Sequence, residues 1–367
     1  MRRLISFVFL LLLTHVDAQA QTNHYNRVSI DTDDQYTGDS QRLSAFKAQM
    51  EKGAEFYKSK DYAAAAESFR MAVELDPSNY AAQFQLGLAQ LYLEDYKNAA
   101  AHFQNALSLD NSSSQAWHFL GFAFYNLRDN KRAEKSYLHA LELDGQSSAT
   151  WSNLGLIYVE LDKLEEAESA YTKALALDPN LTGPMTGLCL TYARSRKSAQ
   201  GVAMCRKAMA AQPSATASYY LAWSYLDLKR LPEAIQQLEK CIRLEPKNPV
   251  FYLALAEGYQ GLRRYDEAVS YAEKAIQLDP NYEPAYAGLG FLFYEMKKLK
   301  EAKQSFERAL SIEPDSTAAR YNLALTCLAL NQRDCAREQY AILKTVEPVL
   351  STRLFNQIYS GRIFRVK

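Results

Sequence analysis

Apolar residues recur through most of this chain at intervals of three and four, the spacing of one face of an α-helix. In residues 283–316 two such faces follow each other, and lysines crowd the turn between them. Pro314 lacks an amide donor and ends the second helix, and Ser316 can then cap the next one. The stretch therefore predicts a helix–turn–helix unit, whose apolar faces are marked by Tyr286, Leu289, Phe293, Ala302, Phe306 and Ala309.

The same pattern returns at a fixed period. Helix-ending residues lie 34 residues apart, with one interval of 33, at Pro77, Asn111, Gly145, Pro179, Pro213, Pro246, Pro280, Pro314 and Pro348. A period of this size indicates stacked repeats, because one helix pair cannot bury its apolar face alone. The predicted repeats are 46–79, 80–113, 114–147, 148–181, 182–214, 215–248, 249–282, 283–316 and 317–350.

Small residues at two fixed positions predict how each helix pair closes. A bulky side chain at either position would hold the two backbones apart, at a cost of about 1–3 kcal/mol from overpacking. The second helices carry Ala65, Ala99, Ala133, Ala167, Gly201, Ala234, Ala268, Ala302 and Ala336. Twelve residues earlier, the first helices carry Gly53, Gly87, Gly121, Gly155, Cys189, Ala222, Ala256, Gly290 and Ala324.

At these residues the chain resembles the tetratricopeptide repeat family, over 46–350. The fourth unit matches the family pattern at Trp151, Leu154, Gly155, Tyr158, Ala167, Tyr171, Ala174 and Pro179. The resemblance implies an all-α solenoid of tandem helix-turn-helix repeats, wound as a right-handed superhelix, with the first helix of each pair lining a concave groove. It implies a recognition scaffold and no single activity. Residues 351–367 predict a capping helix and a tail.

The N-terminus has the layout of a targeting segment. Arg2 and Arg3 precede an apolar run, and Ala18 and Ala20 are small residues suited to signal-peptidase cleavage. The run is too short to cross a bilayer as a membrane anchor, the alternative interpretation. We therefore predict a signal peptide over 1–20 with cleavage near Ala20, a flexible leader over 21–45, and a secreted or periplasmic protein without an integral membrane span after cleavage.

The balance of charged residues and the lack of catalytic motifs limit the functions that the sequence is compatible with. The 42 basic residues balance 42 acidic residues, so the positive excess of a nucleic-acid-binding protein is missing. No nucleophile elbow, phosphate loop or metal-ligand spacing occurs in the sequence. The sequence therefore predicts no enzymatic activity, no cofactor, no metal site and no small-molecule substrate.

The first-helix side chains that face away from the second helix are unusually apolar and aromatic. Exposed surface of this kind marks a site for a protein or an extended peptide. The alternative is ordinary packing between repeats, or cover for the leader. Lysine is missing at the positions where family members bind a peptide carboxylate, so an apolar ligand is expected. The candidate groove residues are Phe84, Leu88, Tyr92, His118, Phe122, Tyr125, Tyr219, Tyr220, Trp223, Phe291, Tyr294 and Tyr321.

These observations favour an exported scaffold that binds a partner in an apolar and aromatic groove. A second hypothesis is an accessory subunit that recruits substrates for a cell-envelope or glycosyl-transferring enzyme on another chain. A third is a structural protein that self-associates through its end repeats.

The fifth repeat departs most from the pattern. Gly183, Gly187 and Gly201 lower helix stability by up to about 1 kcal/mol each, which predicts a hinge or a change of curvature. An exported protein can form disulfides, and Cys189–Cys205 and Cys327–Cys335 are the possible pairs because their members lie on facing helices. Buried free thiols are the alternative, and Cys241 is expected to stay free.

Overall fold

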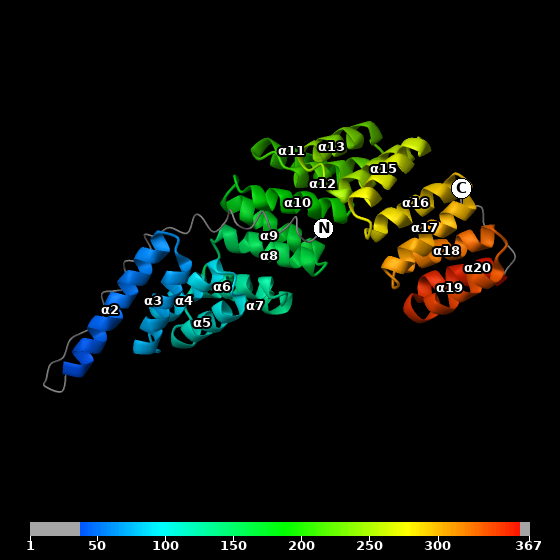
Figure 1. Cartoon of the computed structure of the whole chain (residues 1–367). Coiled ribbons are helices and arrows are strands. Elements are labelled where there is room, and N and C mark those ends of the chain that lie inside the picture. Colours follow the sequence, from blue (N-terminus) through cyan, green and yellow to red (C-terminus); the bar gives the residue numbers. More distant parts are fainter. Residues whose placement is uncertain (1–36, 360–367) are drawn as a thin grey trace. The chain divides into compact units, whose positions relative to one another are not determined.

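The computed structural model describes residues 37–359, and within this range the chain is helical with no β-strand (Figure 1). Within each of its two compact units the helices pack in pairs, and each pair contacts the next, so the predicted all-α solenoid of tandem helix-turn-helix repeats is confirmed. The first helices are α2 (Thr37–Lys58), α4 (Tyr80–Tyr92), α6 (Ser114–Asn126), α8 (Ser148–Glu160), α10 (Thr182–Arg194), α12 (Ala215–Asp227), α14 (Pro249–Gly261), α16 (Glu283–Glu295) and α18 (Thr317–Ala329). The second helices are α3 (Tyr62–Leu75), α5 (Tyr96–Leu109), α7 (Asn130–Leu143), α9 (Leu164–Leu177), α11 (Ser198–Ala211), α13 (Leu231–Leu244), α15 (Tyr265–Leu278), α17 (Leu299–Ile312) and α19 (Arg333–Val346), and α20 (Pro348–Tyr359) closes the series.

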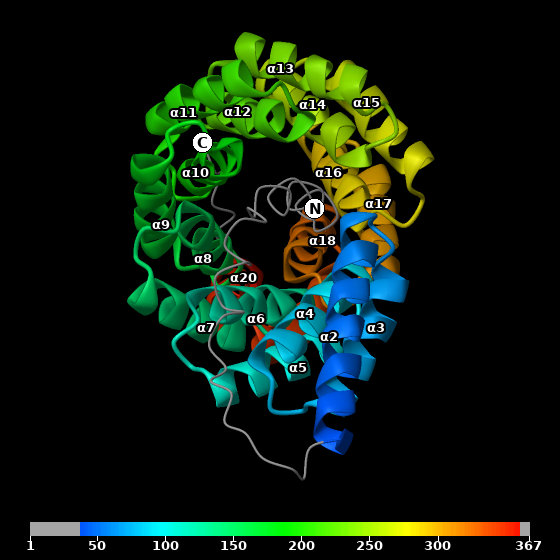
Figure 2. The ribbon, with the colours of Figure 1, turned by 90° about the vertical axis from the view of Figure 1, so that its left-hand side faces the viewer.

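The chain divides into two compact units, an N-terminal unit up to Ser195 and a C-terminal unit from Arg196. The division falls between α10 and α11, inside the fifth repeat. This is the repeat whose glycines predict the weakest helices, and a hinge there stays a prediction. Within the C-terminal unit, α12, α14, α16 and α18 line the inner side of an arc, and α13, α15 and α17 lie on its outer side (Figure 2).

A close approach of glycine to an aromatic ring sets the spacing of several helix pairs. A Cβ atom added to Gly53, Gly87, Gly121, Gly155 or Gly290 would lie 2.6–2.9 Å from a ring carbon of the residue sixteen positions later. Those rings belong to Phe69, Phe103, Tyr137, Tyr171 and Phe306, each at most 3% exposed. Where the second helix offers a smaller residue, such as Ala272, the first helix carries alanine, here Ala256. In these repeats a ring on the second helix thus goes with glycine on the first, and a smaller residue goes with alanine.

The turns within the hairpins share one backbone conformation. In each described repeat, one non-glycine turn residue has a φ between 56° and 65°. In the third repeat, the Arg128 amide donates to the Tyr125 carbonyl and the Asp129 amide to the Phe124 carbonyl, both at 2.9 Å. These bonds satisfy the last carbonyls of the first helix and hold the turn residue in the left-handed region. The residues with positive φ are Lys60, Glu94, Arg128, Asp162, Arg196, Lys229, Arg263, Lys297 and Asn331.

In most repeats, a side chain of the following helix donates a hydrogen bond to the turn that precedes it. In six repeats, a donor in the first turns of the first helix binds the carbonyl six residues earlier, at the helix-ending position. The fifth repeat has Met185 at this position, which cannot donate, and the sixth has Ser218, which donates to Met209 Sδ instead. The fifth and sixth repeats therefore lack this hydrogen bond. The six donors are Gln83, Trp117, Trp151, Tyr252, Tyr286 and Arg320.

Both ends of the solenoid differ slightly from the predicted boundaries. Residues 37–45, assigned to the flexible leader, are helical, because α2 begins at Thr37 and the Arg42 Nε donates to the Leu75 carbonyl at 2.6 Å. The last helix begins at Pro348, a residue favoured at the first helical position, rather than at 351. Leu354 and Ile358 of this helix are buried against α18 and α19, which is the capping role expected of it. The predicted signal peptide lies outside the described residues.

The glycine–ring contact makes a direct prediction for stability. We expect Gly121→Ala to lower the free energy of unfolding by about 1–3 kcal/mol, because the new methyl group must displace the Tyr137 ring at 2.9 Å. Gly145→Ala is the matched control, since its Cβ would meet only the Leu141 carbonyl oxygen at 3.5 Å. Urea denaturation of the two variants measures the difference, and equal midpoints would contradict the contact's role.

Candidate functional site

In the N-terminal unit, three of the predicted groove residues belong to the core. Phe84, Leu88 and Phe122 are only 5–8% exposed. The Phe84 ring centroid lies 5.7 Å from that of Phe103 and 6.0 Å from that of Phe119, so it fills the space between successive repeats. The prediction that these residues offer an exposed binding surface is wrong, because apolar packing between repeats has the same helical spacing as a groove.

The other groove candidates of this unit are partly buried and are held by neighbouring side chains. Tyr92 stacks on Tyr62 with ring centroids 4.3 Å apart. His118 Nδ1 lies 2.8 Å from Thr150 Oγ1, and its ring contacts Tyr137. Burial lowers the pKa of His118 to about 4, so the imidazole is neutral at pH 7. Burial, and then the charge of Glu160, raises the pKa of Tyr125 to about 12.

The first helices of the C-terminal unit present more side chains to solvent than α4, α6, α8 and α10 of the N-terminal unit do. Tyr220 is buried at 4% exposure, so its assignment to the groove surface is wrong. Tyr219 is partly buried and contacts Phe251 with ring centroids 5.5 Å apart. Trp223, Tyr294 and Tyr321 are partly exposed. Phe291 is 39% exposed, which is unusual for a phenylalanine on a folded domain.

Four of these first-helix positions form one row, which we call the inner row: Trp223, Glu257, Phe291 and Leu325. Each is 34 residues from the next, and each directly follows a buried small residue, Ala222, Ala256, Gly290 or Ala324. The four therefore occupy the same register on α12, α14, α16 and α18, the helices on the inner side of the arc (Figure 2). In the N-terminal unit the corresponding residues of α4, α6, α8 and α10, which are Leu88, Phe122, Leu156 and Leu190, are buried at 5–9% exposure, and only Ala54 of α2 is exposed.

Glu257 is the one charged member of the inner row, and the sequence prediction missed it. It forms no hydrogen bond or ion pair among the described residues. Its side chain is accessible to solvent, but the helices on either side displace part of its water and raise the pKa of the carboxyl above its usual value. Burial, and then the Glu257 charge, raises the pKa of Tyr282 to about 12 and that of Tyr219 as well. The charge of the carboxylate thus acts on two phenols, and no cation among residues 37–359 forms an ion pair with it.

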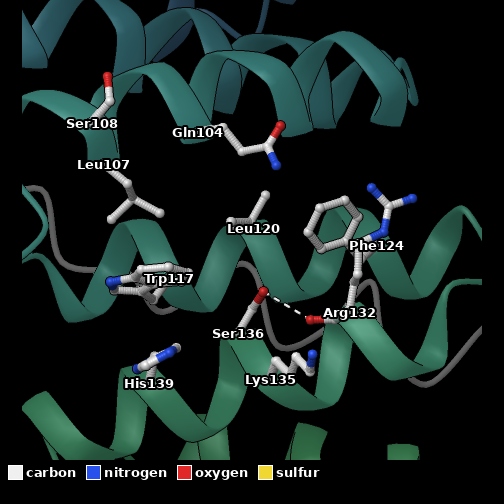
Figure 3. A pocket seen from close by; sticks show the side chains of 10 residues that line it. All are labelled: Gln104, Leu107, Ser108, Trp117, Leu120, Phe124, Arg132, Lys135, Ser136 and His139. Carbon is white, nitrogen blue, oxygen red and sulfur yellow. Dashed lines mark hydrogen bonds between the residues drawn. The ribbon is translucent and has the colours of Figure 1, made fainter.

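A hollow of about 430 Å³ lies on another face of the N-terminal unit, between α5, α6 and α7 (Figure 3). Trp117 and Phe124 contribute its aromatic wall, with the Arg132 guanidinium 4.3 Å above the Phe124 ring. Arg132 is paired with Asp129 at 2.5 Å, and His139 with Glu142 at 2.9 Å. A smaller hollow of about 250 Å³ occurs at the matching place between α11, α12 and α13. We interpret both as gaps produced by repeat packing.

The structure shows the bonding state of three cysteines. Cys327 and Cys335 form a disulfide between α18 and α19, with Cα atoms 6.0 Å apart. Cys241 is a free, buried thiol that donates to the Ala215 carbonyl, and burial raises its pKa to about 12. Cys189 and Cys205 fall in different units, and their pairing stays a prediction. Across residues 37–359, no group of three or more His, Cys, Asp or Glu side chains is arranged to hold a metal ion, and no helix has the length and apolarity to span a bilayer.

Comparison with known proteins agrees with this geometry. The family model described as the cilia and flagella-associated protein 70 C-terminal domain matches residues 17–249, and the tetratricopeptide repeat model matches 225–289, 259–305 and 293–347. Because the first match spans more than half of the sequence, the chain belongs to this tetratricopeptide repeat family. No curated protein matches the chain.

Solved structures share the fold at low sequence identity. A chain of the crystal structure of the APC/C hetero-tetramer Cut9-Hcn1 is 14% identical, with a TM-score of 0.55 over 84% of this chain and 74% of that one. PilF of Pseudomonas aeruginosa is 19% identical, with a TM-score of 0.48 over 60% of this chain and 100% of that one. MamA is 18% identical, with a TM-score of 0.40 over 55% and 96%. At 14% identity, the likeness to the Cut9-Hcn1 chain shows the fold alone.

The neutral His118 predicts a pH dependence of stability. The unfolded chain takes up a proton at the usual histidine pKa near 6.5, whereas the folded chain does so near 4, so stability is lost as pH falls between these values. Between pH 7 and pH 4, we expect wild-type protein to lose about 1–3 kcal/mol more unfolding free energy than His118→Gln. His139→Gln, at an exposed histidine, is the control. Identical pH profiles for all three proteins in urea denaturation would rule out the buried neutral imidazole.

Proposed function

We propose that this protein is a scaffold that holds a segment of a partner protein along the inner row of the C-terminal unit. The tetratricopeptide fold supports protein–protein interaction, and its family is generally non-catalytic. The observation that carries the proposal is the accessibility of Trp223 and Phe291 at matching positions of the C-terminal unit, where α4, α6, α8 and α10 of the N-terminal unit bury their counterparts. Accessible aromatic side chains give a partner large contact area at a low entropic cost.

The inner row also extends across several repeats and does not form a closed pocket. Its members lie on successive helices at one register, and Tyr294 and Tyr321 stand beside it on α16 and α18. A partner that runs across the first helices can therefore contact several repeats in turn. This arrangement favours an extended segment over a compact ligand, because the contacts are spread along the stack.

We also propose that the chain is exported. The support is the N-terminal pattern of Arg2, Arg3, an apolar run and small residues up to Ala20, together with the Cys327–Cys335 disulfide. Disulfides persist in oxidising compartments and are rare in the cytosol.

Export predicts a shortened protein. N-terminal sequencing of the chain purified from its native cells should begin at or near Gln21, because signal peptidase would remove the preceding residues. Protein from the same cells treated with a signal-peptidase inhibitor is the control, and it should begin at Met1 or Arg2. A chain that keeps residues 1–20 in untreated cells would contradict export by this route.

The binding proposal predicts that Phe291→Ala weakens partner capture without unfolding the protein. Phe291 is 39% exposed, so its truncation should change the melting temperature little, whereas loss of a central aromatic contact should lower affinity about tenfold or more. Leu244→Ala is the matched control, because Leu244 is 57% exposed but lies on α13, a second helix.

The measurement is photo-crosslinking in the native cells, with a photoreactive residue at position 291 or 244 and quantitative recovery of the crosslinked peptides. The proposal expects a defined peptide from position 291 and a much weaker yield from position 244. Equal crosslinking at the two positions, or undiminished partner recovery by Phe291→Ala, would contradict it.

A further inference from the structure

The inner row contains one side chain that its apolar surroundings do not explain. Glu257 stands on α14 between Trp223 of α12 and Phe291 of α16, at the same register on three successive first helices. A residue chosen only to pack or to contact an apolar segment would be uncharged there. A carboxylate in partly desolvated surroundings is unfavourable for the folded chain unless a cation or a hydrogen-bond donor compensates it.

Other carboxylates of the C-terminal unit do have such compensation. Glu233 pairs with Arg230 at 2.5 Å, Glu267 pairs with Arg264, and Glu307 lies 3.8 Å from Lys303. Those pairs join residues on the second helices or at their first turns. Within the described residues, Glu257 has neither an ion pair nor a hydrogen bond, and the raised pKa of its carboxyl agrees with this. The described part of the chain therefore supplies no cation or hydrogen-bond donor for this carboxylate.

The aromatic neighbours indicate which kind of molecule fits. Trp223 and Phe291 flank the carboxylate in the row, and Tyr219 lies on the same helix as Trp223, four residues earlier. The charge of Glu257 also contributes to the raised pKa of Tyr219 and of Tyr282. Indole, phenyl and phenol faces attract cations, and a carboxylate beside them adds a direct ion pair. Anions would be repelled by Glu257 and by Glu295, which is exposed near Tyr294. The surroundings are those of a binding site for an ammonium or guanidinium group.

We propose that Glu257 determines the specificity of the inner row by binding a lysine or arginine side chain of an extended partner segment, with apolar partner side chains on Trp223 and Phe291. This inference rests on the proposed function and names the partner's chemistry. Packed helices lie about 8–10 Å apart and an extended chain advances about 3.3 Å per residue, so the apolar residues should stand about three positions before and after the basic one.

The test is selection from a display library of random twelve-residue peptides on the full chain, with Glu257→Gln and Glu257→Lys in parallel. The wild type should enrich peptides with one lysine or arginine flanked by apolar residues at about three positions. The best wild-type peptide should bind Glu257→Gln about tenfold more weakly, as expected for loss of one charge-assisted hydrogen bond. Glu257→Lys should select acidic residues in place of the basic one.

A matched control separates charge at this position from charge in general. Glu273→Gln removes an exposed carboxylate from α15, a second helix, and should select the same peptides as the wild type with unchanged affinity. Thermal unfolding checks each variant, and Glu257→Gln should melt no lower than the wild type because it relieves the desolvated charge.

The two ways of failing are distinct. If the wild type enriches apolar peptides that lose affinity in Phe291→Ala but carry no basic residue, this inference is overturned and the proposed function stands. If Glu257→Gln and the wild type bind the same basic peptides equally well, the inference is also overturned. If no version of the protein enriches any peptide, the proposed binding of an extended segment fails, and the role of Glu257 fails with it.

Discussion

The closeness of the two helices in each hairpin is the constraint on which the rest of the structure depends. In five of the repeats an aromatic ring of the second helix rests on a glycine of the first, as Tyr137 rests on Gly121, and no side chain larger than hydrogen fits between them. Elsewhere another small residue of the first helix, such as Ala256, takes the place of the glycine. This contact fixes the rotation of the first helix as well as its distance. The residue one position further along is then turned to the same side in every repeat. The inner row is a consequence of this, since Glu257 follows Ala256 and Phe291 follows Gly290.

Much of the fold could be predicted because each repeat carries its own sequence signals for where its helices end. Proline or glycine at the helix ends and small residues at the contact points are local signals, and their 34-residue period repeats them. The start of α2 could not be predicted in this way, because residues 37–45 precede the first full period and carry polar side chains. Their helix is held by tertiary contacts, such as that of Arg42 with the Leu75 carbonyl.

The site was less predictable than the fold. Phe84, Phe122 and Tyr220 share the helical spacing of an exposed face, but neighbouring repeats cover them, and only the packing shows this. Glu257 could not be predicted from the apolar and aromatic pattern for the opposite reason, because its side chain is a carboxylate. Its position directly after Ala256, in phase with Trp223 and Phe291, is a signal that the sequence does contain. The position directly after the small residue of each first helix defines the whole inner row.

The central claim is that partner binding uses the first helices of the C-terminal unit. Hydrogen–deuterium exchange of the full chain, with and without a captured partner segment, tests it most directly. We expect new protection in α12, α14 and α16, on the side that bears the inner row, with α13 and α15 unchanged. Protection confined to α13 and α15, or to the N-terminal unit alone, would contradict the claim.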